Sequence, residues 1–144
     1  MIYCDTSYLV RLYLSESGHT EVRKLCAGHE VASAVHALAE LPAALHRAFR
    51  EGRLPPASFT EALEQFAEDK AAHSFHWLPL HEALVDGMAF HFAKFPATTF
   101  LRAADALHLA CAAAHDFKEV YSNDRHFLAA AGLFGLEGKN IIPH

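Results

Sequence analysis

The sequence has 144 residues, of which 52% are apolar and 20% are charged. This length suits one domain, residues 1–144, and such a chain can bury about 68–70% of its unfolded surface, so the composition excludes a disordered protein. The net charge of −5, from 17 acidic residues against 12 Lys and Arg, argues against broad electrostatic binding of nucleic acid. It leaves room for a site where bound cations supply the positive charge.

The sequence carries no signal for a membrane or an oxidising compartment. No apolar run reaches the roughly 18 residues of a spanning helix, and the first residues lack the basic segment of a secretory signal. Cys4, Cys26 and Cys111 are far apart and form neither a disulfide framework nor a CxxC metal pair. We therefore expect a cytoplasmic protein with no membrane segment.

Short β-prone runs alternate with longer helical patterns along the chain. In chain order we expect a strand at Ile2–Cys4, helices at Ser7–Leu14 and Thr20–Ala27, a strand at Val31–Ser33, helices at Val35–Arg50 and Phe59–His73, a strand at Trp77–Leu80, helices at His81–Lys94 and Arg102–His115, a strand at Glu119–Ser122, a helix at Asp124–Ala131 and a last edge strand at Asn140–Ile142. Strands separated by helices pair in parallel through right-handed crossovers. The pattern predicts an α/β fold of three layers, with a central parallel sheet of four to five short strands and helices on both faces.

Four acidic residues are expected at one edge of this sheet. Asp5 ends the first strand and Asp124 follows the fourth, while Glu40 lies within about two helical turns of the end of the second strand. Asp105 lies early in a helix that is apolar almost all round, so its carboxylate should be buried. Ligands of parallel sheets bind beyond the carboxyl ends of the strands, which makes this edge the candidate site.

A buried carboxylate needs a partner, because an isolated charge is costly in the protein interior. For Asp105 the local candidates are Arg102 and Arg125, or a bound cation. Carboxylate and hydroxyl oxygens without Cys or paired His suit hard cations such as Mg²⁺ or Mn²⁺. Simpler interpretations stay open: Asp5 and Asp124 as helix caps, Glu40 paired with His36, and Asp105 paired with Arg102.

Four segments carry a resemblance to the PIN-domain family, and within it to the VapC-type toxins of toxin–antitoxin pairs. The opening Ile-Tyr-Cys-Asp-Thr-Ser-Tyr-Leu-Val at 2–10 resembles the first strand and acidic turn of that family, and Glu40 falls where the family has its helical acid. Arg-Ala-Ala-Asp-Ala-Leu-His-Leu-Ala at 102–110 resembles its most specific motif, and Tyr-Ser-Asn-Asp-Arg-His-Phe at 121–127 its last strand and acid. The resemblance implies a Mg²⁺- or Mn²⁺-dependent endoribonuclease that forms a homodimer and is inhibited by a cognate antitoxin.

The resemblance also implies roles for individual residues. The catalytic and metal-binding set would be Asp5, Glu40, Asp105 and Asp124. Supporting groups that orient ligands or waters would be Thr6, Ser7, Ser122 and Asn123, and the RNA substrate would meet Arg102 and Arg125. A metal at such a site acidifies a water to make the nucleophile for phosphodiester hydrolysis. We expect His108, on the Asp105 face of its helix, to be a hydrogen-bonded core residue.

Two other functions are compatible with part of this pattern. A phosphoryl-transfer hydrolase of the haloacid dehalogenase type also begins strand-Asp, but it needs a second Asp two residues later, where this chain has Ser7. A non-catalytic PIN-like module that binds RNA or protein stays open as the alternative.

Four phenylalanines fall around the loop before the Asp105 helix: Phe90, Phe92, Phe95 and Phe100. Burial of every ring beside Pro96 is difficult, and exposed aromatic clusters mark interaction surfaces. We expect this segment to form part of a homodimer interface, with a groove that leads to the acids and receives the antitoxin.

Overall fold

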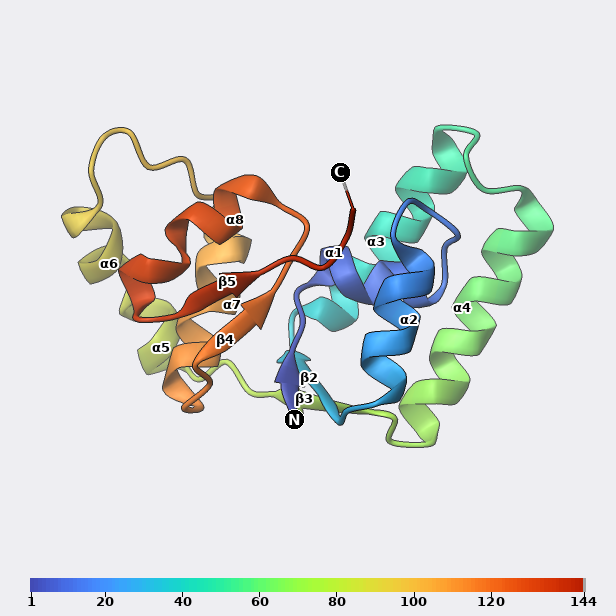
Figure 1. The fold of residues 1–144 in the computed structure, drawn as a ribbon, viewed down its shortest axis with the longest axis horizontal. Coiled ribbons are helices and arrows are strands. Elements are labelled where there is room, and N and C mark those ends of the chain that lie inside the picture. The colour runs from blue at the N-terminus through green and yellow to red at the C-terminus, as the bar shows by residue number, and fades with distance from the viewer. Residues whose placement is uncertain (144) are drawn as a thin grey trace.

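The computed structural model describes residues 1–143, and its centre is a sheet of five short parallel strands. The first three, β1 (Ile2–Tyr3), β2 (Val31–Ala34) and β3 (Phe75–Leu78), pair in the order β1-β2-β3, and β4 (Glu119–Tyr121) pairs with β5 (Glu137–Lys139). A parallel bridge between Cys4 and Tyr121 joins the two groups, so the order across the sheet is β3-β2-β1-β4-β5. Figure 1 shows the strands between two helical groups. The predicted parallel sheet and fold class are confirmed.

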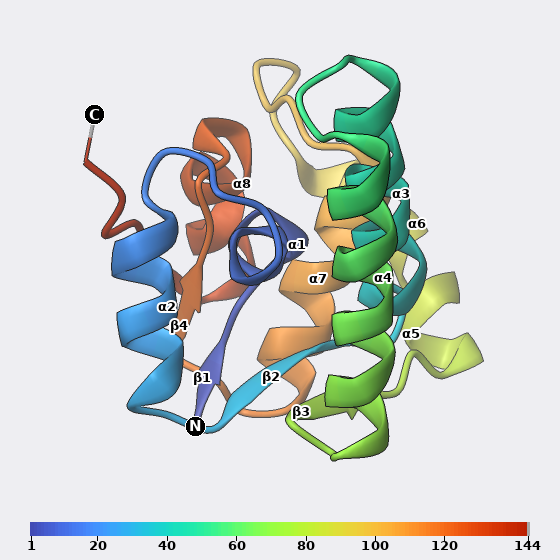
Figure 2. The same ribbon diagram turned by 90° about the vertical axis from the view of Figure 1, so that its right-hand side faces the viewer.

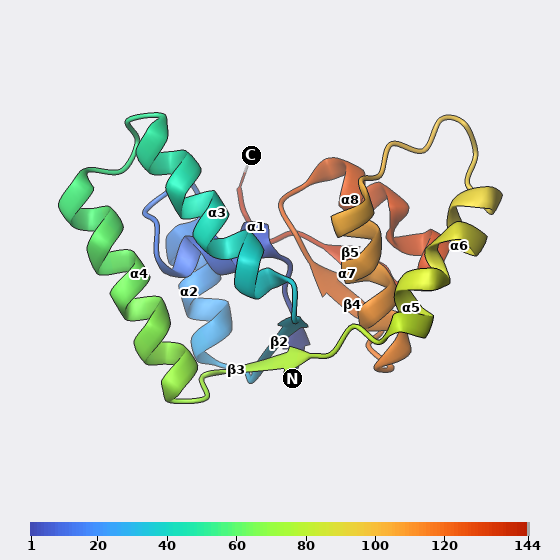
Figure 3. The same cartoon turned by 180° about the vertical axis from the view of Figure 1, so that it is seen from behind.

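Helices cover both faces of the sheet. They are α1 (Thr6–Leu9), which continues into the 3₁₀ helix η1 (Val10–Leu12), α2 (His19–Ala27), α3 (Ala37–Arg50), α4 (Pro56–Ala71), α5 (Glu82–Asp86), α6 (Met88–Lys94), α7 (Ala103–Ala114), α8 (Arg125–Ala130) and the 3₁₀ helix η2 (Ala131–Phe134). Figure 2 shows α2 on one side of β1 and β2, and α7, α3 and α4 on the other. From behind, α3 and α4 form a pair at one end of the molecule, and α5 to α8 gather at the other end (Figure 3). None of the helices in residues 1–143 has the length and apolar character needed to span a bilayer.

Three sequence predictions about elements were wrong. The predicted helix at His81–Lys94 is divided at Gly87 into α5 and α6. The third strand begins at Phe75 and ends at Leu78, because Pro79 has no N–H to continue the ladder. The last strand is Glu137–Lys139 rather than 140–142. Gly138 lies in it because α8 packs so closely that a Cβ there would come within 2.9 Å of the Leu128 side chain.

Two hydrophobic clusters hold the sheet between its helices. One gathers Leu9, Val22, Leu41 and Phe66 with their neighbours from α1 to α4. The other packs Tyr3, Leu109, Val120 and Phe127 between β1, α7, β4 and α8. Because β1 and β4 lie side by side, the residues that follow them, Asp5 and Ser122, meet at the carboxyl edge of the sheet.

Candidate functional site

Asp5 is the best-buried acid of the site, with 4% of its surface exposed. It caps α1, and its Oδ1 accepts hydrogen bonds from the Ser7 hydroxyl (2.6 Å) and the Tyr8 N–H (3.2 Å). Its Oδ2 accepts from the Ser122 hydroxyl at 2.5 Å. Burial raises the pKa of Asp5, and the hydrogen bonds from Ser122 and Ser7 act in the opposite direction. Asp5 is therefore a helix cap, and the same contacts hold it rigidly at the edge of the sheet.

The turn after β4 is tied to the same two serines. The N–H of Asp124 donates to the Ser122 hydroxyl at 3.0 Å, and the N–H of Asn123 donates to the Ser7 hydroxyl at 2.9 Å. Asp124 caps α8 through Oδ1, which accepts from the N–H groups of His126 (2.8 Å) and Phe127 (3.0 Å). Within the described chain no hydrogen bond reaches its Oδ2. One oxygen of Asp124 thus serves the helix and the other is available to a ligand.

Asp105 lies in the first turn of α7 and shares a pocket of about 340 Å³ with Phe100, Arg102, Asp124 and His126. Burial, followed by the negative charges of Asp5 and Asp124, raises the pKa of Asp105 to about 6. Glu40 raises this pKa further. The structure therefore brings the four predicted acids into one electrostatically coupled group.

No basic side chain balances Asp105 among residues 1–143. The ion pairs of the described chain, all within 4.0 Å, do not include this carboxylate. Arg102 is exposed at the N-cap of α7 and lines the same pocket without pairing to Asp105. The alternative interpretation of Asp105 as one half of an Arg102 ion pair is wrong.

Glu40 is held by a chain of hydrogen bonds from three elements. Its Oε1 accepts from the Thr6 hydroxyl (2.9 Å) and from His108 Nε2 (2.6 Å). His108 Nδ1 lies 2.6 Å from the Tyr3 hydroxyl, which accepts from the Ala34 N–H at 3.0 Å. Because that hydroxyl already accepts one bond, it donates to Nδ1, and the imidazole proton belongs on Nε2, facing Glu40.

This network sets the charge of Glu40. Burial acts to raise the pKa of Glu40, but the hydrogen bonds from His108 and Thr6 outweigh it and lower the pKa. His108 is 1% exposed, which confirms the prediction of a hydrogen-bonded core histidine. Glu40 is thus held as an anion with its Oε1 fully engaged.

His36, Glu40 and His108 offer ligand atoms within 4.8 Å of one another, yet their hydrogen bonds argue against a metal held by these three. His36 Nε2 donates to the Ala104 carbonyl at 2.9 Å, and His108 Nε2 donates to Glu40. A nitrogen that carries a proton cannot ligate a metal. His36 also lies 3.5 Å from Glu40, as the sequence alternative anticipated, but within this network rather than on a solvated face.

We expect replacement of His108 by alanine to destabilise the protein by roughly 2–4 kcal/mol, since it removes the acceptor of the Tyr3 hydroxyl and one donor to Glu40, and opens a cavity. Urea unfolding measures this loss. His29 is the matched control, because it is exposed and bonds only to Leu25 of its own helix end. Equal stability of the His108→Ala and His29→Ala variants would contradict the network.

The supporting residues divide into two groups. Thr6 bonds to Glu40, and Ser7 and Ser122 bond to Asp5. Asn123 contacts this group through its backbone N–H, which donates to Ser7, while its side-chain oxygen accepts from Asn140 at 3.1 Å. Arg125 is exposed and lies outside the residues that line the pocket.

Sequence reasoning missed the role of Tyr3. Tyr3 is two residues before Asp5 and points to the opposite face of β1 from Cys4, so alternation along the strand was the available signal. Its partner His108 is 105 residues away, a separation that no local pattern spans.

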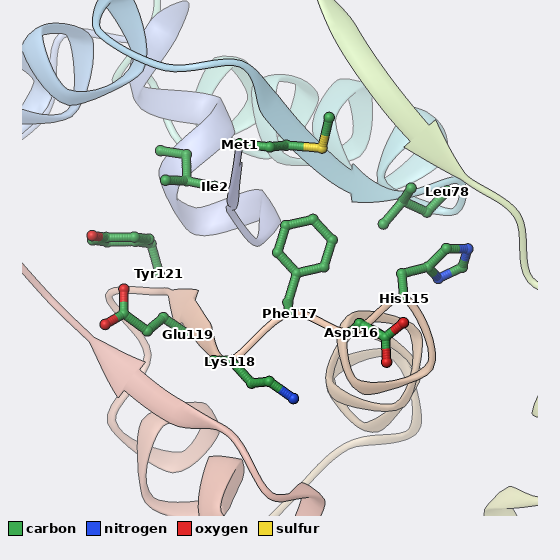
Figure 4. Close-up of a pocket in the computed structure, with 9 residues that line it drawn as sticks. All are labelled: Met1, Ile2, Leu78, His115, Asp116, Phe117, Lys118, Glu119 and Tyr121. Carbon is green, nitrogen blue, oxygen red and sulfur yellow. The ribbon is translucent and has the colours of Figure 1, made fainter.

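A larger pocket, of about 540 Å³, lies away from the acids. Figure 4 shows it around the Phe117 ring, with Met1 and Leu78 to one side. The lining also includes Lys118 and Glu119 at the start of β4, but none of the four acids. Size alone therefore does not mark the candidate site, and the clustered carboxylates do.

The fold is that of a known class of protein. The family model of the PIN domain matches residues 2–133, and the chain belongs to this family. Among solved structures the chain is similar to VapC20 of Mycobacterium tuberculosis, described as a sarcin–ricin-loop-cleaving toxin, with a TM-score of 0.70 and 20% identity over 95% of this chain and 99% of that chain. At this identity the likeness concerns the fold. No curated protein sequence matches the chain significantly.

Proposed function

We propose that the protein is a metal-dependent endoribonuclease, the toxin component of a type II toxin–antitoxin system. The observation that carries the proposal is the group of four acids at the carboxyl edge of the sheet, with Asp105 unpaired among the described residues. Membership of the PIN family and the likeness in fold to a VapC toxin support it.

The acids fit a hard divalent cation such as Mg²⁺ or Mn²⁺. Such ions take carboxylate oxygens, and the coupled acids here repel one another in the absence of positive charge. In this proposal Asp5, Asp105 and Asp124 hold the ion, with Glu40 bound directly or through a water. When bound, it supplies an acidified water and neutralises charge on the phosphodiester in the transition state.

Neighbouring polar residues orient the carboxylates of Asp5 and Glu40. Ser7 and Ser122 fix both oxygens of Asp5, so its position does not depend on ligand binding. His108 and Thr6 hold Glu40 as an anion, and Glu40 is thereby able to orient a water or accept its proton. Arg102 supplies the positive charge in the pocket that a phosphate of the RNA requires.

Cleavage of RNA by the purified chain tests the proposal, with Asp124→Asn as the inactive variant and Asp116→Asn as its control. Asp116 is an exposed acid beside the other pocket, and its φ of 63° is one that asparagine adopts readily. We expect Asp124→Asn to lose activity by at least about a hundredfold and Asp116→Asn to match the unsubstituted chain. Because VapC20 is described as cleaving the sarcin–ricin loop, a ribosomal RNA hairpin is the first substrate to test. A chain that binds RNA but leaves it intact with either metal would instead be the non-catalytic module.

The proposal includes a homodimer. Phe90 and Phe92 are exposed by 62% and 40%, and Phe95 packs between Phe92 and Phe134. We expect sedimentation to show a dimer and Phe90→Asp to shift it towards monomer, since a charge opposes burial of this patch. Ile141→Asp, at an exposed residue of the C-terminal segment, is the control. A monomer in both variants and in the unsubstituted chain would contradict the dimer.

A cognate antitoxin is the second partner in this proposal. It would present a basic side chain to the carboxylates, so that metal and antitoxin compete for the same group. Binding of the antitoxin encoded beside this chain should therefore weaken as the Mn²⁺ concentration rises, and Asp124→Asn should weaken it in the absence of metal. Binding that ignores both changes would contradict this part.

A further inference from the structure

An exposed ring, Phe100, and a half-buried one, His126, form an aromatic pair beside the acids. Phe100 lies in the loop before α7 with 57% of its surface exposed, and His126 lies in the first turn of α8. Their ring centroids are 4.5 Å apart, with 51° between the ring planes. Both rings line the pocket of Asp105 and Asp124, so the pair stands next to the groups that would hold the metal.

The same two rings also line a second hollow. This hollow, of about 150 Å³, continues from the pair towards Thr98, Thr99 and Ala129. The pair therefore forms a ridge between an acidic pocket and a smaller hollow edged by two threonines. If a nucleobase stacks on this ridge, the nucleotides before and after it can lie in the two hollows.

The exposure of Phe100 calls for an occupant, because a phenylalanine ring in contact with water forgoes the gain from burial of its apolar surface. The pocket below it has two carboxylates and Arg102, so an apolar protein segment would bury charges there without partners. A nucleotide matches both features: its base has a flat face for the rings, and its phosphate accepts from Arg102. Phe90, by contrast, is covered by Lys94, whose Nζ lies 3.8 Å from the ring centroid.

We propose that Phe100 and His126 form a stacking subsite for an unpaired nucleobase of the RNA substrate, next to the phosphodiester that the acids cleave. This inference rests on the proposed function. Unstacked bases of single-stranded RNA bind aromatic side chains in this way with little dependence on sequence. The subsite would favour loops and single strands over duplex, whose bases are already stacked.

The test uses binding without cleavage. The probe is a short single-stranded oligoadenylate that contains one 2-aminopurine, and the protein carries Asp105→Asn so that the probe stays intact. Stacking on an aromatic ring quenches the fluorescence of this base. We expect Phe100→Ala to weaken binding roughly five- to a hundredfold and to remove the quenching, and Phe100→Trp to keep both. Phe49→Ala, the same substitution at a ring of α3 with 37% of its surface exposed, should leave both unchanged.

His126 provides a second, independent variant. Its backbone N–H, rather than its ring, donates to Asp124, so His126→Ala keeps the cap of α8. We expect His126→Ala to weaken binding and His126→Phe to restore it, which a charge contact would not do. If Phe100→Ala binds and quenches like Phe49→Ala, the subsite is wrong, whereas RNA cleavage by the chain without substitutions still upholds the proposed function. If Phe100→Ala instead changes only the oligomeric state or antitoxin binding, the ridge is a protein interface and the inference is overturned.

Discussion

Replacement of Asp105 by asparagine is expected to abolish RNA cleavage while making the metal-free protein more stable. Asp105 lacks an ion-pair partner and a hydrogen-bond donor among the described residues, so the substitution removes charge without removing a contact. Activity should fall by at least about a hundredfold, because the amide is a poorer ligand for a divalent cation. A carboxylate kept for its charge should show this combination, whereas a residue that holds the fold by a contact would lose stability when replaced.

The stability change has a predictable dependence on pH. Burial and the charges of Asp5 and Asp124 raise the folded-state pKa of Asp105 to about 6, above the unfolded value of about 3.9. The protonated form is thus favoured by folding, and this stability is present below about pH 4 and lost as the pH rises through about 6. After allowance for solvent screening, we expect Asp105→Asn to gain about 1–2 kcal/mol near pH 7, or about 2–6 °C in Tm.

Differential scanning calorimetry in excess chelator measures this gain, with Asp116→Asn as the control. The advantage of the Asp105→Asn variant should shrink as the pH falls from about 6 towards about 4 and vanish below that, where the aspartate is neutral in both states. The control should show no such trend. A large loss of Tm for Asp105→Asn at neutral pH would mean that Asp105 stabilises the fold by a contact of its own, and the metal site would lose its main support.

The parallel sheet could be predicted because its strands are short apolar runs separated by helices, and strands connected through helices pair in parallel. The last strand could not, because Glu-Gly-Lys at 137–139 reads as a turn. Its Gly138 is explained only by the approach of Leu128 from α8, a tertiary contact. The division of α5 from α6 was also missed, although Gly87 was the visible signal.

The acids could be predicted for a related reason: the carboxyl edge of a parallel sheet collects whatever follows its strands. The hydrogen bonds that hold these acids in place could not be predicted. Asp5 is fixed by Ser122, which comes 117 residues later, and Glu40 by His108, 68 residues away. Such bonds depend on side-chain orientation across elements, and hydrophobic periodicity contains no record of it.

Mg²⁺ or Mn²⁺ is expected to be required for cleavage and to stabilise the fold through the same carboxylates. Removal of the ion leaves coupled negative charges that repel the phosphodiester, so activity in excess chelator should fall by roughly a hundredfold or more. Ca²⁺ should bind but support little turnover, because it accepts looser geometry. An ion at about a hundred times its Kd stabilises the folded state by about 2.7 kcal/mol, which a thermal melt detects.

The variant that separates binding from folding is Asp105→Asn rather than Asp5→Asn, because Asp5 accepts three hydrogen bonds and its replacement would disturb α1. We expect Mn²⁺ to raise the Tm of the unsubstituted chain and of Asp116→Asn by the same amount, and to raise that of Asp105→Asn much less. Isothermal titration with Mn²⁺ gives the affinities directly. Full activity in excess chelator would remove the metal from the mechanism. An equal rise in Tm with Mn²⁺ in all three proteins would place the metal away from Asp105, because the expectation depends on the carboxylates around this residue.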